Sequence, residues 1–305
     1  MHIENKRVLG VAFDIQGVPT YARANKEVIL SAGAVVSPVI LQRSGIGDPD
    51  LLKQHNIDLV HKLPGVGENL QDHLQVRAVF KVKNADTLNE QANSWLGKAK
   101  MAFDYAFFRR GPLSMAPSQL GGFAKSDKQY DTANLEYHIQ PLSCEKLGDP
   151  LHKFPAITVS VCNLRPKSRG HIRLSSANPY ASPVITPNYL SHAEDKQVAA
   201  DALKLSRNIC KADAFKKYQP EEFKPGIEVH TDEELIKAAG DIATTIFHPV
   251  GTCRMGNSSM SVVDSQLKVH GIDQLRVVDA SIMPTITSGN TNSPTIMIAE
   301  KAAEM

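Results

Sequence analysis

The pattern that most constrains the fold is a short buried strand followed by a helix, and it occurs near both ends of the chain. Near the start, E-V-I-L (27–30) is an apolar strand pattern that runs into the small residues S-A-G-A and then a helical segment. Near the end, L-R-V-V (275–278) leads through a polar loop to a terminal helix over 295–303. This alternation is typical of an α/β unit, so we expect both ends to belong to one unit.

The middle of the chain has a different pattern. From about residue 76, V-R-A-V-F-K-V and A-I-T-V-S-V-C alternate as strands of an antiparallel sheet do, and helical spacing covers 94–108, 195–212 and 232–239. We therefore predict a mixed fold, α/β at the ends and α+β in the middle. Residues 1–75 and 245–305 form one unit, and residues 76–244 form an inserted antiparallel sheet flanked by helices.

Three helix starts are predicted where an N-cap residue precedes a proline. These pairs are Ser37-Pro38, Asp48-Pro49 and Ser293-Pro294. The third pair follows a polar loop of mostly small residues, 287–293, close to Asp279 at the end of the last strand. An ordinary structural cap is the favoured interpretation of this pattern alone. The alternative is an anion site at the helix N-terminus, which would stabilise the negative charge of a reduced flavin.

Composition excludes several classes of function. The chain has 34 Lys and Arg against 32 Asp and Glu among 305 residues, with no basic stripe, which argues against nucleic acid as a partner. Its four cysteines form no C-x-x-C pair and no Cys/His cluster, so we expect reduced thiols and no metal site. No apolar run approaches the length of a membrane span.

The segment T-I-F-H-P-V-G-T-C-R-M-G (245–256) contains the histidine that we single out, His248. A histidine in such a run is more often packed or hydrogen-bonded than catalytic. The alternative is a catalytic base on a rigid corner beside Pro249. The choice between these interpretations depends on other segments of the chain.

Three separated blocks together resemble the glucose–methanol–choline (GMC) family of flavin-dependent alcohol oxidoreductases. They are G-A-V-V-S-P-V-I-L-Q-R-S-G-I-G (33–47), V-G-E-N-L-Q-D-H (66–73), and 248–256 with 263–303. Their order and spacing fit over nearly the whole chain. The T-C-R-M-G and S-G-N-T-N-S-P segments resemble the bacterial alcohol and choline dehydrogenase branch.

The resemblance implies a catalytic pair, His248 and Asn290, which are separated by 42 residues. In such a pair the imidazole takes the hydroxyl proton of a primary alcohol while hydride passes to flavin N5. The second group holds the developing alkoxide through a hydrogen bond. Because Asn290 can donate but cannot act as a base, the pair resembles Asn-type members, including choline dehydrogenases, more than His/His oxidases.

The resemblance also implies FAD as the cofactor. The implied contacts are the following residues: Ala32, Gly33, Ala34, Asp279, Ala280, Asn290, Thr291 and Pro294. Asn69 and His73 either line the flavin or substrate channel or belong to a hydrogen-bonded loop. For a further four apolar residues, core packing is favoured over a place in the substrate pocket: Phe107, Phe108, Leu113 and Met115.

The chain departs from the family pattern in one respect. The family carries a G-x-G-x-x-G βαβ unit that cradles the FAD pyrophosphate. Neither G-I-G (45–47) nor G-V-G (65–67) continues to a third glycine. We expect a partial FAD-binding domain that lacks this unit, binds flavin weakly alone, and self-associates or is complemented by an N-terminal half. A catalytically inactive fragment is the alternative.

The resemblance implies a small primary alcohol as the substrate, and choline is the main alternative to a neutral alcohol. It also favours an electron acceptor other than oxygen. A quaternary ammonium such as choline needs an acidic or aromatic cage, and the sequence does not identify one. For its location we favour a cytoplasmic or inner-membrane-associated bacterial protein.

Overall fold

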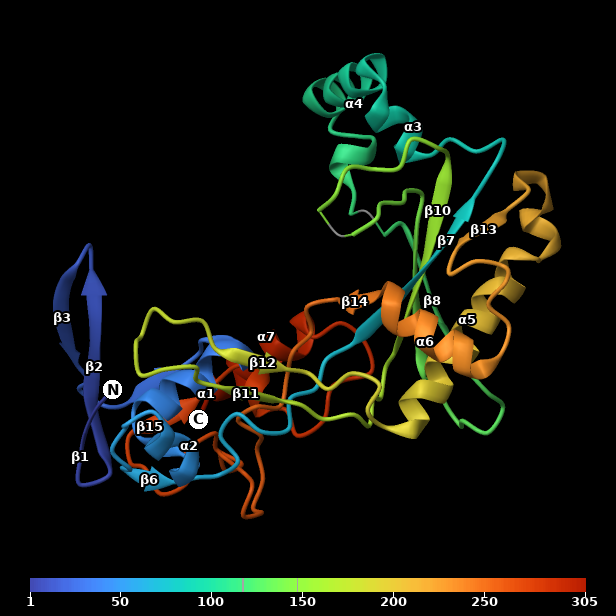
Figure 1. The fold of residues 1–305 in the computed structure, drawn as a ribbon. Helices are drawn as coiled ribbons and strands as arrows, with labels where there is room; N and C mark the ends of the chain where they lie inside the picture. The colour runs from blue at the N-terminus through green and yellow to red at the C-terminus, as the bar shows by residue number, and fades with distance from the viewer. Residues whose placement is uncertain (117, 147) are drawn as a thin grey trace. The chain divides into compact units, whose positions relative to one another are not determined.

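The computed structural model describes all of the 305 residues except 117 and 147, and they form two compact units (Figure 1). Unit 1 comprises Met1–Asp72, Pro166–Ser191 and Phe247–Met305, and unit 2 comprises His73–Arg165 and His192–Ile246. One segment differs from the predicted division. Residues 166–191 belong to unit 1 because Ile172 and Leu174 are buried against Val39, Leu52 and Leu70.

Unit 1 holds the two strand–helix patterns of the chain ends. Strands β4 (Val28–Leu30) and β15 (Leu275–Val277) pair in parallel, with Leu275 opposite Val28 and Val277 opposite Leu30. Helix α1 (Gly33–Arg43) follows β4, and helix α7 (Asn292–Ala303) ends the chain. The two ends of the chain therefore contribute one strand each to a small parallel sheet.

The remaining elements of unit 1 are short strands and one helix. An antiparallel three-stranded sheet opens the chain, and its β2–β3 turn has positive φ at Gln16 and Gly17, which is typical of a two-residue hairpin turn. Two more strand pairs, β5–β6 and β11–β12, complete the unit. The bounds are β1 (His2–Glu4), β2 (Arg7–Ile15), β3 (Val18–Arg23), β5 (Ile46–Gly47), α2 (Pro49–Gln54), β6 (His61–Lys62), β11 (His171–Arg173) and β12 (Val184–Thr186).

The core of unit 1 surrounds the parallel pair. Leu275 and Val277 are almost fully buried, together with Leu41 from α1 and Val263 and Cys253 from the last third of the chain. Burial of each such side chain contributes roughly 1.5–3 kcal/mol. The core therefore fixes the ends of β4 and β15, where the predicted cofactor contacts lie.

Unit 2 is built on an antiparallel sheet of six strands in the order β13-β7-β10-β9-β8, with β14 also paired to β7. Helix α5 packs on β10 and β7, and α6 packs on β7 and α5 (Figure 1). The predicted antiparallel sheet with flanking helices is confirmed. The bounds are β7 (Leu74–Lys81), α3 (Leu88–Asn93), α4 (Trp95–Phe108), β8 (Leu120–Ala124), β9 (Leu135–Gln140), β10 (Ala156–Asn163), α5 (Ala193–Cys210), β13 (Glu221–Lys224), α6 (Asp232–Ile242) and β14 (Ala243–Thr245).

Candidate active site

The structure brings the two predicted catalytic residues together within unit 1. The side-chain Nδ2 of Asn290 lies 3.5 Å from Nε2 of His248, at the outer limit of a hydrogen bond. Asn290 is exposed and His248 is half-buried, so both polar groups can reach a small ligand. An alcohol oxygen about 2.8 Å from each nitrogen would complete a triangle, with one hydrogen bond to each side chain.

The backbone of His248 is held by a buried carboxylate. Asp72 Oδ1 accepts a hydrogen bond from the His248 backbone N–H at 2.9 Å, and Asp72 Oδ2 accepts a short one from the Tyr189 hydroxyl. The preceding residue, Phe247, has a left-handed φ of 64°, which is unfavourable for an aromatic residue. The Asp72 contact therefore stabilises a corner that the local sequence does not favour.

The loop that carries Asp72 also binds the two segments that hold the pair. Asn69 Nδ2 donates to Gly251 O at 3.1 Å, and Gln71 Nε2 donates to Pro284 O at 3.1 Å. The Gln71 side-chain oxygen accepts from the backbone N–H of Ile286 at 3.2 Å. Asn69 thus acts as a member of a hydrogen-bonded loop, one of its two predicted roles.

His73, the last residue of the same sequence block, forms a different contact. It is fully buried, it belongs to unit 2, and its Nε2 lies 3.2 Å from Leu164 O. Of its two predicted roles, these contacts fit the hydrogen-bonded loop, and the channel lining stays a prediction. Asp72, Gln71 and Tyr189 were not predicted as site residues. For Asp72 and Gln71 the V-G-E-N-L-Q-D-H block was the available indication, whereas nothing in the sequence pointed to Tyr189.

Helix α1 begins at Gly33 rather than at the predicted Ser37-Pro38. Pro38 lies inside the helix and cannot donate to the carbonyl of Ala34 four residues earlier. That carbonyl accepts a hydrogen bond from Thr252 Oγ1 at 2.6 Å instead. Because the Ala34 carbonyl has this tertiary donor, Pro38 is tolerated inside the helix and does not mark its start. At α2, by contrast, Asp48 caps the helix and Pro49 is its first residue, as predicted.

The carboxylate of Asp279 joins the end of β15 to the start of α1. Its Oδ2 accepts from Gly33 N at 2.9 Å and from Ser37 Oγ at 2.6 Å, and its Oδ1 accepts from Ser281 N at 2.8 Å. Asp279 is 6% exposed, so its side chain is used within the chain. A contact between Asp279 and a cofactor would therefore run through its backbone.

The segments around Ala32 and Gly33 are open enough for a flat cofactor to approach the backbone. Gly33 has a φ of 79°, and a Cβ added to it would meet no atom within 4 Å. Ala32 is exposed, whereas Ala34 is buried and Ala280 half-buried. Ala32 and Gly33 are therefore the most accessible of these small residues.

Helix α7 begins at Asn292, whereas the predicted Ser293-Pro294 start made Pro294 its first residue. The observed start is thus two residues earlier than predicted. Pro294 is tolerated because the N–H groups of a helix's first turn have no partner inside the helix. Thr291 is the N-cap residue, and none of the described side chains forms a capping hydrogen bond there. This free helix N-terminus, next to Asn290, fits the electron-rich pyrimidine edge of a flavin.

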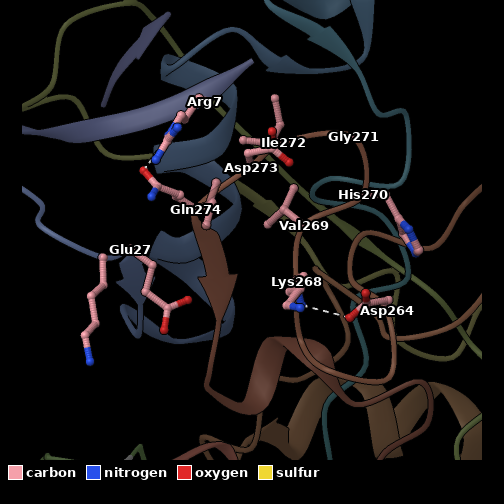
Figure 2. A pocket seen from close by; sticks show the side chains of 12 residues that line it. Arg7, Glu27, Asp264, Lys268, Val269, His270, Gly271, Ile272, Asp273 and Gln274 are labelled. Carbon is pink, nitrogen blue, oxygen red and sulfur yellow. Dashed lines mark hydrogen bonds between the residues drawn. The ribbon is translucent and has the colours of Figure 1, made fainter. Parts of the chain in front are cut away.

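A separate cavity of about 610 Å³ lies near the amino ends of β4 and β15, away from Gly33 and Asp279 (Figure 2). Its walls mix cations such as Arg7 and Lys268 with the acids Glu27 and Asp273. Arg7 Nε donates to Gln274 Oε1 at 2.9 Å. Because neither charge dominates and His248 is not part of the lining, we do not assign the catalytic chemistry to this cavity.

Two sequence models of the GMC oxidoreductase family match the chain, one over residues 1–75 and the other over residues 166–299. Together they cover more than half of it. The chain belongs to the GMC oxidoreductase family. Members of the family are FAD-dependent, and the small residues and free helix N-terminus described above fit that cofactor.

Among GMC relatives, the oxygen-dependent choline dehydrogenase of Escherichia coli strain K12 is 43% identical over 305 residues, which is 99% of this chain and 54% of the relative. The enzyme of the same name from Klebsiella pneumoniae is 44% identical over 302 residues, which is 98% of this chain and 54% of the relative. The chain thus spans about half the length of these relatives. The similarity fits the bacterial alcohol and choline dehydrogenase branch.

Solved GMC structures share the fold. The formate oxidase of Aspergillus oryzae RIB40 superposes with a TM-score of 0.92 at 28% identity, covering 99% of this chain and 58% of that one. Pyridoxine 4-oxidase from Mesorbium loti gives a TM-score of 0.84 at 26% identity, covering 99% and 55%. The mixed α/β architecture with an antiparallel sheet is therefore that of the family.

Neither a metal site nor a membrane-spanning helix is found among the described residues. No group of three or more His, Cys, Asp or Glu side chains among them is arranged to hold a metal ion. In the same part of the chain, no helix combines the length and apolar character needed to cross a membrane.

The four residues predicted to pack in the core do not do so. Their exposed fractions are 71% for Phe107, 55% for Phe108, 55% for Leu113 and 56% for Met115. The prediction of core packing is wrong because the helix that carries the first two contacts the rest of unit 2 mainly through α3 and the segment just after it.

Proposed function

We propose that the protein to which this chain belongs oxidises a primary alcohol to an aldehyde with FAD, and that His248 and Asn290 carry the reaction. The approach of His248 Nε2 and Asn290 Nδ2 to 3.5 Å, across 42 residues of sequence, is the observation that supports this most directly. Bound FAD would supply the hydride acceptor.

The chain's own residues then have distinct tasks. The imidazole of His248 accepts the hydroxyl proton of the alcohol at Nε2, the ring nitrogen that faces Asn290. The amide of Asn290 donates a hydrogen bond to the same oxygen and stabilises the negative charge that develops there. Asp72 keeps the His248 backbone in place, so the base needs little reorganisation when the alcohol enters.

The two units have different tasks in this proposal. Unit 1 contributes a partial FAD-binding domain, and unit 2 contributes to substrate binding. The 305 residues contain no G-x-G-x-x-G, and β4 and β15 form only a two-stranded parallel sheet. We therefore propose that tight FAD binding needs a further G-x-G-x-x-G unit, on the same or another polypeptide, and that this chain alone binds FAD weakly. The competing hypothesis is that this chain is a catalytically inactive fragment.

Choline is the substrate favoured by the relatives, since the proteins that are 43–44% identical are named choline dehydrogenases. A neutral primary alcohol remains the other candidate, because no cage of acidic or aromatic side chains is assigned to a quaternary ammonium. For the electron acceptor we propose a compound other than oxygen. The relatives' names include the words oxygen-dependent, so both acceptors belong in the test.

The test compares choline with a neutral primary alcohol of similar size, each with oxygen and with an artificial dye acceptor, in protein reconstituted with FAD. Flavin retention after desalting is measured first. Retained flavin and choline turnover with the dye would support the full proposal. Retained flavin without turnover of either alcohol would contradict the proposed reaction. Loss of flavin would support the need for a further nucleotide-binding unit, and the assay is then repeated with a polypeptide carrying that unit.

A further inference from the structure

Helix α4 has an apolar face that the described residues leave exposed, and the helix can be followed in Figure 1. Trp95, Leu96, Phe103 and Phe107 are 79%, 72%, 54% and 71% exposed. At 100° per residue they fall within one arc of the helix, together with small alanines. The one buried residue of the helix, Met101, lies on the opposite side and anchors α4 to the unit. The apolar face therefore points away from the packing contact.

Basic residues border this apolar face. Lys98 and Lys100 lie on its two edges in the helical projection, and Arg109 and Arg110 follow at the C-terminal end. Both lysines are exposed. The only acidic residue of the helix, Asp104, lies 3.6 Å from the Arg110 guanidinium. The segment from Trp95 to Arg110 thus presents aromatic side chains with a clear excess of positive charge.

We propose that α4 binds the surface of an anionic lipid bilayer and lies parallel to it. Aromatic residues on one face and lysines at its edges are the pattern of interfacial helices, since Trp and Phe enter the headgroup boundary while Lys side chains reach the anionic phosphates. Charge favours an anionic lipid surface over a second copy of the chain. If the apolar faces of two copies packed together, the four bordering cations of each copy would lie near those of the other and repel them.

The length of the helix agrees with a surface orientation. Its 14 residues extend for about 21 Å, which is shorter than the roughly 30 Å hydrocarbon core of a bilayer. Two apolar side chains just beyond the helix, Leu113 and Met115, are also exposed. Unit 2 would therefore be attached peripherally, through side chains that have no role in its core.

Trp95 makes the proposal directly measurable, because it is the only tryptophan of the chain. The emission of Trp95 is recorded while vesicles of phosphatidylcholine, or of phosphatidylcholine with phosphatidylglycerol, are added to the whole chain. We expect a shift to shorter wavelength and co-flotation with the anionic vesicles, both weakened by salt, and little change with the neutral ones.

Two double variants keep Trp95 as the reporter. Phe103→Ser with Phe107→Ser should lose binding through the apolar face, and Lys98→Glu with Lys100→Glu should lose it through charge. The matched controls are Ile227→Ser, at a site that is 76% exposed, and Lys216→Glu with Lys217→Glu, both elsewhere in unit 2. Each control should bind anionic vesicles as the unmodified chain does, and far-ultraviolet circular dichroism checks that every variant is folded.

Three results would overturn the proposal. The first is an absence of any shift or flotation with anionic vesicles. The second is equal loss of binding in the controls. The third is a Trp95 shift that depends on protein concentration without lipid, which would mean that a second copy covers the apolar face.

Discussion

The carboxylate of Asp72 accepts the backbone N–H of His248 at 2.9 Å, although the two residues are 176 positions apart in the sequence. Tyr189 donates to the other oxygen of the same carboxylate. This relationship gives the proposed catalytic base a fixed corner, which its own segment would not hold because Phe247 is in a left-handed conformation.

Replacement of Asp72 should therefore slow the reaction without touching the imidazole. We expect Asp72→Ala to lower the rate of flavin reduction by alcohol by about 10²-fold, the scale of a 1 Å misplacement. Asp72→Asn keeps an acceptor for the His248 N–H and should lose much less. Hydrogen exchange at the His248 amide gives a second readout, since it should be faster in the alanine variant. Unchanged rate and exchange in Asp72→Ala would refute this role.

Gly33→Ala tests the cofactor surface. Its φ of 79° should cost the variant about 1 kcal/mol of stability, and the new methyl group projects into open space where the flavin is proposed to lie. Gly17→Ala is the matched control, because Gly17 has a φ of 83° and equally open surroundings in the β2–β3 turn. Thermal unfolding should show similar losses in both variants, whereas only Gly33→Ala should weaken FAD binding. Equal FAD affinities would place the flavin elsewhere.

Gln42 links α1 to residues 166–191, which were predicted to lie outside unit 1 but belong to it. It is fully buried, donates to Ile172 O at 3.0 Å and Val66 O at 3.2 Å, and accepts from Leu174 N at 2.8 Å. Gln42→Leu leaves these backbone groups unsatisfied and should cost about 2–4 kcal/mol in the free energy of unfolding. Urea unfolding measures it, with the exposed Gln54→Leu expected to change little. A loss below that of the control would show that the three hydrogen bonds contribute nothing net.

Unit 1 should lose stability as the pH falls below about 6.5. Burial, together with a nearby lysine or arginine, lowers the pKa of His61 and of His171 from the usual 6.5. The unfolded chain therefore binds more protons in the window from 6.5 down to the lowered values, so unfolding becomes more favourable as the pH drops through that window. Thermal unfolding between pH 8 and 5 should show this loss. His61→Gln should reduce it, and an identical pH profile in that variant would exclude His61 as a cause.

Local patterns in the sequence predicted the strands and helices that depend on nearby residues. Alternation was sufficient for β7 and β10, and the predicted Asp48 N-cap with Pro49 as first residue is present at α2. The predicted start of α1 was wrong because a tertiary contact outweighed the proline pattern. The start of α7 was misplaced because a proline is tolerated throughout the first helical turn and so does not fix the first residue. Thr252 satisfies the carbonyl that Pro38 leaves free, and it lies 218 residues from its partner Ala34.

The candidate site was partly predictable for a related reason. His248 and Asn290 were found through their resemblance to a family pattern, and the structure places them side by side. Tyr189 has no such pattern, and the predicted division placed its segment outside the unit that holds the pair. Only the burial of Ile172 and Leu174 reveals why that segment packs near the Asp72 loop.

The most direct test of the proposed chemistry is the visible absorbance of FAD-loaded protein during anaerobic addition of choline. The unmodified protein should show bleaching of the flavin band. Asn290→Ala should bleach more slowly, by about 10²–10³-fold if one oxyanion-type donor is lost, and His248→Ala should bleach the least. Both variants should retain FAD. Bleaching of His248→Ala at the unmodified rate would contradict the account, since the proton would then be taken by another group.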